Sequence, residues 1–271
     1  MPLPGEAEGS IRRRTTLLVN NMTGIPKSHP RYESLTLREK LVEGFREGYV
    51  VPQGLIAHGR GEMFDYLLGE KTTKEARIAS KAAAALLVKS KRPVISVNGN
   101  VAALCPKEIV RLSEAAEARI EVGLFHRTDQ RVSSIQRILE QNGAREVLGF
   151  LPDASIPGLD SLRGLCTMEG IFTADVVLIP LEDGDRTEAL AKMKKKTIAI
   201  DLNPMSRTSR KATVTIVDEV SRTIPEMIRN VVDLEDNPRA AKQALSKYDR
   251  DENLAAVRDK MASNLSKFLE R

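Results

Sequence analysis

Hydrophobic positions in the second half of the chain follow two alternating periods. Short, continuous apolar runs are followed by stretches in which apolar residues recur every three or four positions. This alternation is typical of βαβ units and predicts a parallel sheet. The predicted strands cover 94–97, 120–125, 147–151, 176–180, 197–202 and 213–217, and the helices between them cover 101–118, 129–142, 186–195 and 220–232.

The chain before residue 93 is predicted to be mainly helical. Apolar residues at intervals of four, Leu37, Leu41 and Phe45, predict a first helix that ends near Gly48. Residues 74–89 predict a helix that is apolar around most of its circumference and therefore buried. Between these two helices, 54–62 is interpreted as a short apolar run that breaks into a glycine-rich turn, with another helix starting at 63–68.

The predicted fold class is α/β, a doubly wound, mainly parallel Rossmann-like sheet with a helical N-terminal part and a C-terminal helix. We expect a flexible extension over 1–24, a Rossmann-like domain with N-terminal helices over 25–235, and a C-terminal helical segment over 236–271. The Pro- and Gly-containing segment 152–170 is long enough to be a functional loop. The C-terminal helix carries an apolar stripe that packs on its own domain or against a second chain: Leu254, Val257, Met261, Leu265 and Phe268.

Composition narrows the possible functions. The 271 residues include 42 Lys and Arg against 37 Asp and Glu, and the two signs are interspersed, so the net charge of +5 suits small anionic ligands. Aromatic residues make up 4% of the chain, too few for the stacking platforms of single-stranded nucleic-acid binders. Cys105 and Cys166 stand alone, and no membrane span or signal peptide is apparent. We therefore expect a cytoplasmic protein with no nucleic-acid or membrane partner.

Polar residues directly follow several predicted strands, at the sheet edge where ligands bind in parallel α/β folds. Asn98 and Asn100 follow the first strand, where they either bind an anion at a helix N-terminus or form the turn and cap the helix. Asp201 is a candidate for binding the ribose of a nucleoside, because an acidic residue at such a strand end commonly accepts hydrogen bonds from ribose hydroxyls. Asp218 and Glu219 follow the last strand and are expected to complete the nucleoside-binding pocket with Asp201.

A second polar group follows the strand at 176–180. Glu182, Asp183 and Asp185 precede Arg186 in a segment that leads into a helix. Three carboxylates in this arrangement are suited to hold a magnesium ion, with Arg186 paired with phosphate. Solvated capping of the helix is the alternative interpretation.

Glycine and cationic motifs complete the candidate chemistry. Gly59 and Gly61 form Gly-x-Gly without the third glycine of the dinucleotide fingerprint, and the sequence contains no GxxxxGK[ST] phosphate loop. A nicotinamide-dependent dehydrogenase and a P-loop kinase are therefore disfavoured. His29 is either a switchable donor or a turn residue between prolines. A doubly anionic substrate would find fixed and switchable donors in Lys27, His29, Arg31, Arg38 and Arg60.

Five motifs, in order along the chain, resemble the archaeal phosphopantothenate synthetase family, also called 4-phosphopantoate–β-alanine ligase. The resemblance covers about Ile25 to Val232. Its motifs begin at Ile25 (IPKSHPRY), Gly54 (GLIAHGRGE), Ser96 (SVNGNVAAL), Pro180 (PLEDGDRTEA) and Ile200 (IDLNPxSRT).

The resemblance implies an ATP-dependent ligase of coenzyme A biosynthesis. Such an enzyme joins 4-phosphopantoate to β-alanine through an acyl adenylate and releases AMP and diphosphate. It also implies a homodimer, a Rossmann-like core and ATP as substrate. Mg²⁺ is expected as a cofactor, because ATP and the phosphorylated acid bring several negative charges into one cleft. Glu219 stands where we expect Asn in this family. The ATP contacts implied are Arg38, Arg60, Asp201, Leu202, Asn203, Arg207, Thr208, Asp218 and Glu219.

Residue chemistry suggests further roles. Lys27, His29 and Arg186 are expected to face the phosphorylated acid or the reacting centre as catalytic residues. The substrate-binding candidates are Arg31, Asn98, Asn100, Asp183 and Asp185. A non-catalytic ATP-binding sensor that uses the same cleft is the alternative function.

Overall fold

The structure is a computed structural model that describes residues 24–269, and its centre is a five-stranded parallel sheet. The expected 1–24 extension lies outside the described residues apart from Gly24. In space the strand order is β2-β1-β5-β6-β7, which confirms the predicted α/β, Rossmann-like class. The strands are β1 (Pro93–Val97), β2 (Arg119–Val122), β5 (Val176–Pro180), β6 (Lys196–Ile200) and β7 (Val214–Ile216).

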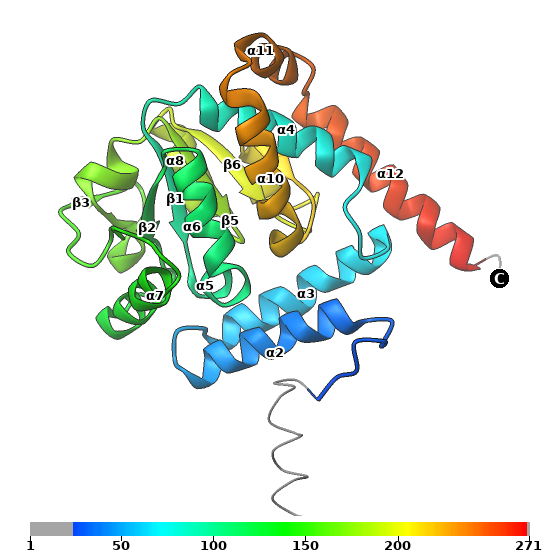
Figure 1. Ribbon diagram of the computed structural model, residues 1–271, viewed down its shortest axis with the longest axis horizontal. Helices are drawn as coiled ribbons and strands as arrows, with labels where there is room; N and C mark the ends of the chain where they lie inside the picture. Colours follow the sequence, from blue (N-terminus) through cyan, green and yellow to red (C-terminus); the bar gives the residue numbers. More distant parts are fainter. Residues whose placement is uncertain (1–23, 270–271) are drawn as a thin grey trace, which may run out of the picture.

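Helices cover both faces of the sheet (Figure 1). Alternate strand residues point to opposite faces, so Ile95 and Leu178 pack on one side while Val94 and Val177 pack on the other. The first face is covered by α4 (Lys74–Val88), α6 (Pro106–Ala115), α7 (Asp129–Gln141) and α10 (Val220–Glu235). The second face is covered by α8 (Gly184–Lys192) and by residues 154–174.

The predicted strand at 147–151 is wrong. Leu148 alone forms a parallel bridge, to Glu121 of β2, with a backbone hydrogen bond on each side. Gly149 follows with φ of +106°, and a Cβ at this position would lie 2.7 Å from the carbonyl oxygen of Val122. Extended pairing therefore stops after one residue, although the segment lies where a sixth strand would complete the sheet.

The predicted glycine-rich turn at 54–62 is also wrong, because α3 (Pro52–Leu68) runs through it as one helix. Its glycines allow close packing instead. A Cβ on Gly54 would lie 3.2 Å from the Asn100 side-chain carbon Cγ, with the amide oxygen nearer still, and a Cβ on Gly61 would lie 3.4 Å from Leu202. A glycine inside a helix costs about 1 kcal/mol relative to alanine, an amount that tertiary packing can offset.

Two other predicted segments are subdivided in the structure. The helix at 101–118 is α5 (Gly99–Leu104) followed by α6, because Pro106 begins a new helix and leaves Cys105 with a non-helical φ of −149°. The loop 152–170 contains the antiparallel pair β3 (Ala154–Ser155) and β4 (Leu165–Cys166), the 3₁₀ turn Ser161–Gly164 and the start of the π-helical turn Met168–Phe172.

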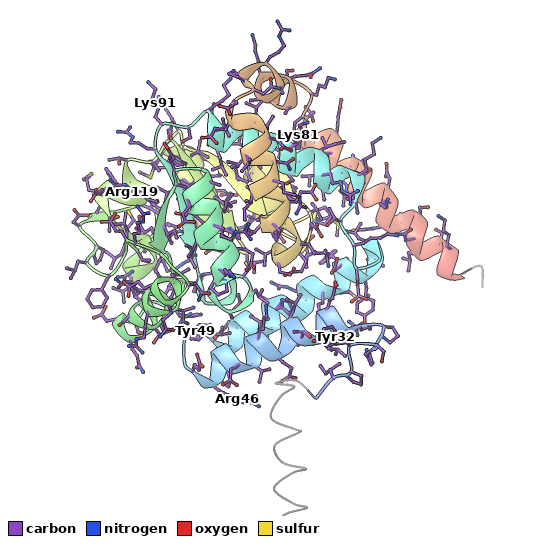
Figure 2. The ribbon with its side chains drawn as sticks, viewed as in Figure 1. Tyr32, Arg46, Tyr49, Lys81, Lys91 and Arg119 are labelled. Carbon is purple, nitrogen blue, oxygen red and sulfur yellow. The ribbon has the colours of Figure 1, made fainter. Side chains whose placement is uncertain are left out.

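Helices α2 (Tyr32–Arg46) and α3 lie across the carboxyl ends of the strands. Figure 2 places Lys91, just before β1, at the far side of the sheet from Tyr32, Arg46 and Tyr49. This arrangement puts both helices over the edge at which a parallel sheet binds ligands.

The C-terminal part comprises α11 (Pro238–Ser246) and α12 (Arg250–Leu269). Leu254, Val257 and Met261 of α12 are buried with residues of α3 and with Val217, which directly follows β7, so this part of the apolar stripe packs on its own chain. Leu265 is half exposed, and the side chain of Phe268 lies outside the described part. The boundaries at 25 and 236 stay predictions. Within residues 24–269, no helix has both the length and the apolar character of a bilayer-crossing segment.

Candidate functional site

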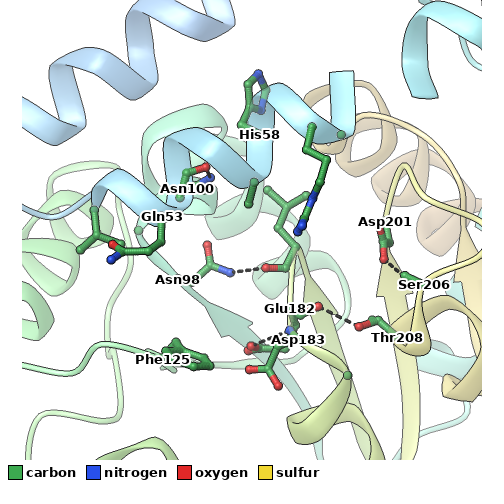
Figure 3. A pocket seen from close by; sticks show the side chains of 18 of the residues that line it. Gln53, His58, Asn98, Asn100, Phe125, Glu182, Asp183, Asp201, Ser206 and Thr208 are labelled. Atoms are coloured by element: carbon green, nitrogen blue, oxygen red, sulfur yellow. Dashed lines mark hydrogen bonds between the residues drawn. The ribbon is translucent and has the colours of Figure 1, made fainter. Parts of the chain in front are cut away.

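A cavity of about 560 Å³ opens at the carboxyl ends of β1, β2, β5 and β6, beneath α3 (Figure 3). We call it the main cavity. The strand order reverses between β1 and β5, and ligands of doubly wound folds bind at this switch point. Residues from the sequence motifs line it, among them Arg60, Asn98, Asn100, Asp183, Asp201, Leu202, Asn203, Arg207 and Thr208.

The two asparagines after β1 tie the walls of the main cavity together. Asn98 caps α5 by accepting a hydrogen bond from the Val101 N–H (3.1 Å), and its amide donates to the carbonyl oxygens of Pro180 and Leu181 (both 3.1 Å). Asn100 donates to the carbonyl oxygen of Gly54 (2.9 Å). The turn-and-cap interpretation of Asn98 is therefore confirmed, while its contact with substrate stays a prediction.

Asp201 and Arg60 line the main cavity from two different elements. The Asp201 carboxylate accepts hydrogen bonds from the Asn203 N–H (2.9 Å) and the Ser206 hydroxyl. Burial raises the pKa of Asp201, and these hydrogen bonds and the positive charge of Arg60 on α3 oppose that rise. The structure thus brings together the predicted phosphate-binding arginine and the predicted nucleoside-binding carboxylate.

The carboxylates after β5 do not form the predicted magnesium site. Asp183 caps α8 and accepts a hydrogen bond from Arg163 (3.0 Å), and Asp185 pairs with Arg207 (2.6 Å) and Arg163 (3.4 Å). In the described part of the chain, no three side chains of His, Cys, Asp or Glu gather in a way that would hold a metal. The prediction is wrong because each aspartate is already neutralised by an arginine.

Arg186 lies behind the main cavity rather than in its lining. Its side chain is 4% exposed, and one guanidinium nitrogen donates to the Arg163 carbonyl oxygen (2.8 Å). A Cβ on Gly123 would lie 2.9 Å from a second nitrogen, so this glycine makes room for the guanidinium. The guanidinium of Arg186 forms an ion pair with the carboxylate of Glu182, whose Oε2 lies 3.5 Å from Arg186 Nε.

A second cavity of about 530 Å³ adjoins the main one, because His58 and Leu202 line both. Lys27, His29 and Arg31 line it, as predicted cations for a substrate. His29 Nδ1 accepts a hydrogen bond from the Arg31 N–H (3.0 Å), which supports its interpretation as a turn residue.

Two predicted ATP contacts are engaged elsewhere in the fold. Arg38 lines neither cavity and forms a paired contact with Glu62, with Nε 2.9 Å from one carboxylate oxygen and 3.0 Å from the other. Asp218 is 2% exposed and accepts hydrogen bonds from Arg222 (2.6 Å) and Thr72 (2.6 Å). Glu219 caps α10 and lines the second cavity.

Several residues that line the main cavity are absent from the sequence-based candidates. His58 lies within a recognised motif, and its Nε2 is buried without a hydrogen-bond partner. Burial lowers the pKa of His58. Arg131 donates two hydrogen bonds to the Tyr49 carbonyl oxygen (3.2 and 2.9 Å) and carries no sequence signal. Glu182, which the sequence suggested only as a magnesium ligand, also lines this cavity, and burial raises its pKa to about 7.

Comparison with known proteins finds one consistent group. The family described as phosphopantothenate/pantothenate synthetase matches residues 75–264. A 4-phosphopantoate–β-alanine ligase of Thermococcus kodakarensis is 47% identical over 251 residues, which cover 92% of this chain and 96% of that protein. Ligases of the same name from Methanospirillum hungatei and Methanosarcina mazei are each 56% identical, over 78% and 77% of this chain and 86% and 82% of their own lengths.

Proposed function

The chain belongs to the phosphopantothenate/pantothenate synthetase family, and from this premise we propose that it is an ATP-dependent 4-phosphopantoate–β-alanine ligase of coenzyme A biosynthesis. The observation that carries the proposal is the convergence of four of the recognised motifs, distant in sequence, on the main cavity: Arg60, Asn98, Asp183, Asp201 and Thr208 all line it. An ATP-binding sensor without catalysis is not favoured, since the relatives are named as ligases.

The residue types fit the chemistry of such a ligase. A carboxylate is a poor electrophile, so the acid first attacks the α-phosphate of ATP and becomes an acyl adenylate; β-alanine then displaces AMP. ATP and the phosphorylated acid crowd several negative charges into one cleft, where each like-charged pair at 4 Å costs about 4 kcal/mol at an effective dielectric of 20. Arg60 and Arg207 line the cavity with the positive charge that offsets this repulsion.

We place the nucleoside at Asp201 and Asn203, with the phosphates between Arg60 and the N-terminal end of α9 (Arg207–Lys211). Thr208 stands at that end, and its hydroxyl is already bonded to the Glu182 carbonyl oxygen (2.9 Å). The acid and β-alanine then occupy the part of the main cavity near the ends of β1 and β5.

The second cavity supplies further cationic groups. Lys27, His29 and Arg31 are proposed to bind a substrate phosphate that extends past His58 and Leu202, which line both cavities. Arg38 contributes once Glu62 releases it to phosphate.

Magnesium, the dimer and the location remain proposals of their own. The aspartates after β5 are paired with arginines and do not fit a protein-built magnesium site, so any Mg²⁺ would arrive on the ATP phosphates.

A homodimer is supported by Ile56 and Met63, which lie seven residues apart on α3 with 69% and 61% of their surface exposed. Light scattering would measure its mass. A cytoplasmic location also stays a prediction.

The test is to incubate the protein with ATP, 4-phosphopantoate and β-alanine and to measure AMP. Release that requires both other substrates supports the ligase, whereas ATP binding without AMP release supports the sensor. Arg60→Ala should lower turnover by about 100-fold or more, the scale of losing a donor that stabilises charge in the transition state. Arg137→Ala is the matched control, because Arg137 is an exposed arginine of α7 that lines neither cavity. Near-normal turnover of the Arg60 variant would refute its role.

A further inference from the structure

A buried carboxylate lies at the floor of the main cavity, directly after β5. The Glu182 side chain is 9% exposed and lies between Phe125 and Thr208 in Figure 3. Its Oε1 accepts a hydrogen bond from the Asp183 N–H (3.0 Å). Its Oε2 lies 3.5 Å from Arg186 Nε, which itself forms no hydrogen bond with any described residue. One carboxylate oxygen is therefore available to a ligand in the cavity.

The surroundings of Glu182 place its pKa near neutral pH, so that both protonation states are populated. The pKa of Glu182 is raised to about 7, with burial as the largest cause; the positive charge of Arg186 opposes the rise, and the negative charge of Asp183 adds to it. Arg186 itself donates to the Arg163 carbonyl oxygen and lies within the electrostatic reach of Glu121 and Arg127. A general base works best when its pKa lies near the working pH, so this environment suits proton transfer at neutral pH.

The other titratable groups of the main cavity are less suited to accept a proton. Both oxygens of Asp201 already accept hydrogen bonds. Asp183 is more exposed, at 29%, and is paired with Arg163. His58 lies at the junction with the second cavity, away from the switch point. His126 is exposed on the loop after β2.

We propose that Glu182 is the general base that takes a proton from the ammonium group of β-alanine. The inference rests on the proposed ligase function. The ammonium gives one proton to Glu182, and the neutral nitrogen attacks the acyl carbon of the adenylate. The carbon–nitrogen bond forms, and the bond from carbon to the phosphate oxygen breaks as AMP leaves. The nitrogen loses its second proton to water, and Glu182 returns its own to solvent.

Arg186 has a defined part in this arrangement. A carboxylate buried without a cation would stay protonated at neutral pH and could not accept a proton. The guanidinium, held behind Gly123 and 3.5 Å from Oε2, favours the ionised form without occupying that oxygen with a hydrogen bond. Arg186 is thus a positioning residue that acts through Glu182.

The test separates the two half-reactions in Glu182→Gln, which keeps the size of the side chain and removes the base. Exchange of labelled diphosphate into ATP, dependent on 4-phosphopantoate, reports adenylate formation and should remain within about threefold of the unmodified chain. Amide formation with β-alanine should fall by at least about 100-fold, the usual contribution of a general base. Hydroxylamine, which is unprotonated at neutral pH and needs no base, should capture the adenylate equally well in both proteins.

The pH profile and a matched variant guard against a merely structural role. The logarithm of the rate with β-alanine, plotted against pH, should change slope near pH 7 in the unmodified chain, and this change of slope should be absent from Glu182→Gln. Glu188→Gln, the same change six residues later, within α8 and outside the main cavity, should match the unmodified chain. Amide formation at the unmodified rate in Glu182→Gln overturns the proposal, and so does loss of exchange together with amide formation. Absence of exchange in the unmodified chain overturns the ligase function instead.

Discussion

Replacing Gly99 with alanine tests the close packing that shapes the main cavity. Gly99 begins α5, where a Cβ would lie 3.1 Å from the carbonyl carbon of Tyr49 and nearer still to its oxygen. That oxygen accepts two hydrogen bonds from the buried Arg131. The added methyl must therefore displace backbone rather than a mobile side-chain end, and the displacement weakens both hydrogen bonds.

The expected cost follows from these contacts. Overpacking of a well-packed site costs about 1–3 kcal/mol. Weakening hydrogen bonds to a charged donor adds about 1.5–3 kcal/mol. The better helix propensity of alanine offsets at most about 1 kcal/mol. The free energy of unfolding should therefore fall by about 1.5–6 kcal/mol, which at about 2–4 °C per kcal/mol for a chain of this size lowers the melting temperature by roughly 3–24 °C.

The measurement is thermal and urea unfolding of Gly99→Ala beside Gly59→Ala. A Cβ on Gly59, inside α3, would meet nothing within 4 Å, so that variant should be as stable as the unmodified chain or more stable by up to about 1 kcal/mol. The two variants make the same chemical change in different surroundings. If Gly99→Ala unfolds at the same temperature as Gly59→Ala, the close approach of α5 to Tyr49 does not exist in solution.

Three further predictions concern buried charges and thiols. Arg222→Met leaves the carboxylates of Asp65 and Asp218 buried without their cation and should cost about 3–5 kcal/mol of stability, with partial recovery as the pH falls and the carboxylates gain protons. In the folded protein the pKa of Glu182 is raised to about 7. The protonated carboxyl therefore contributes stability that is fully present below the pKa of the unfolded state and is lost as the pH rises to 7. The free energy of unfolding of Glu182→Gln, measured against pH, should lack this loss. Burial raises the pKa of Cys166 to about 11, and an aromatic disulfide reagent should label this thiol after denaturation and not before.

The sheet was predictable from sequence because its strands are buried on both faces. A continuous apolar run such as 176–180 has few alternatives, and its bounds are those of β5. The segment 147–151 has a similar apolar start, but its outcome depends on Gly149, whose positive φ ends the pairing with β2. The prediction of a turn at 54–62 was wrong for the opposite reason. The glycines of α3 favour a turn locally, whereas contacts with Asn100 and Leu202 decide the conformation.

The candidate site was predictable in position more than in orientation. The strand-end rule locates Asn98 and Asp201 correctly in the lining of the main cavity. The same rule cannot tell that Arg186 points behind Gly123 or that Asp218 pairs with Arg222, because these directions depend on neighbours far away in sequence. Arg131 has no local signal, since its partner is a backbone carbonyl.

The packing of α3 and the shape of the cavity depend on the same contacts. Gly54 lets α3 approach α5 at the end of β1, and Gly61 lets it approach Leu202 at the end of β6. These two contacts hold Arg60, between them on the helix, over the switch point. A larger residue at either glycine would lift α3 from the strand ends and move Arg60 with it. Stability and ligand binding should therefore decrease together at Gly54 and Gly61, whereas Gly59→Ala, on the open side of the same helix, should lower neither.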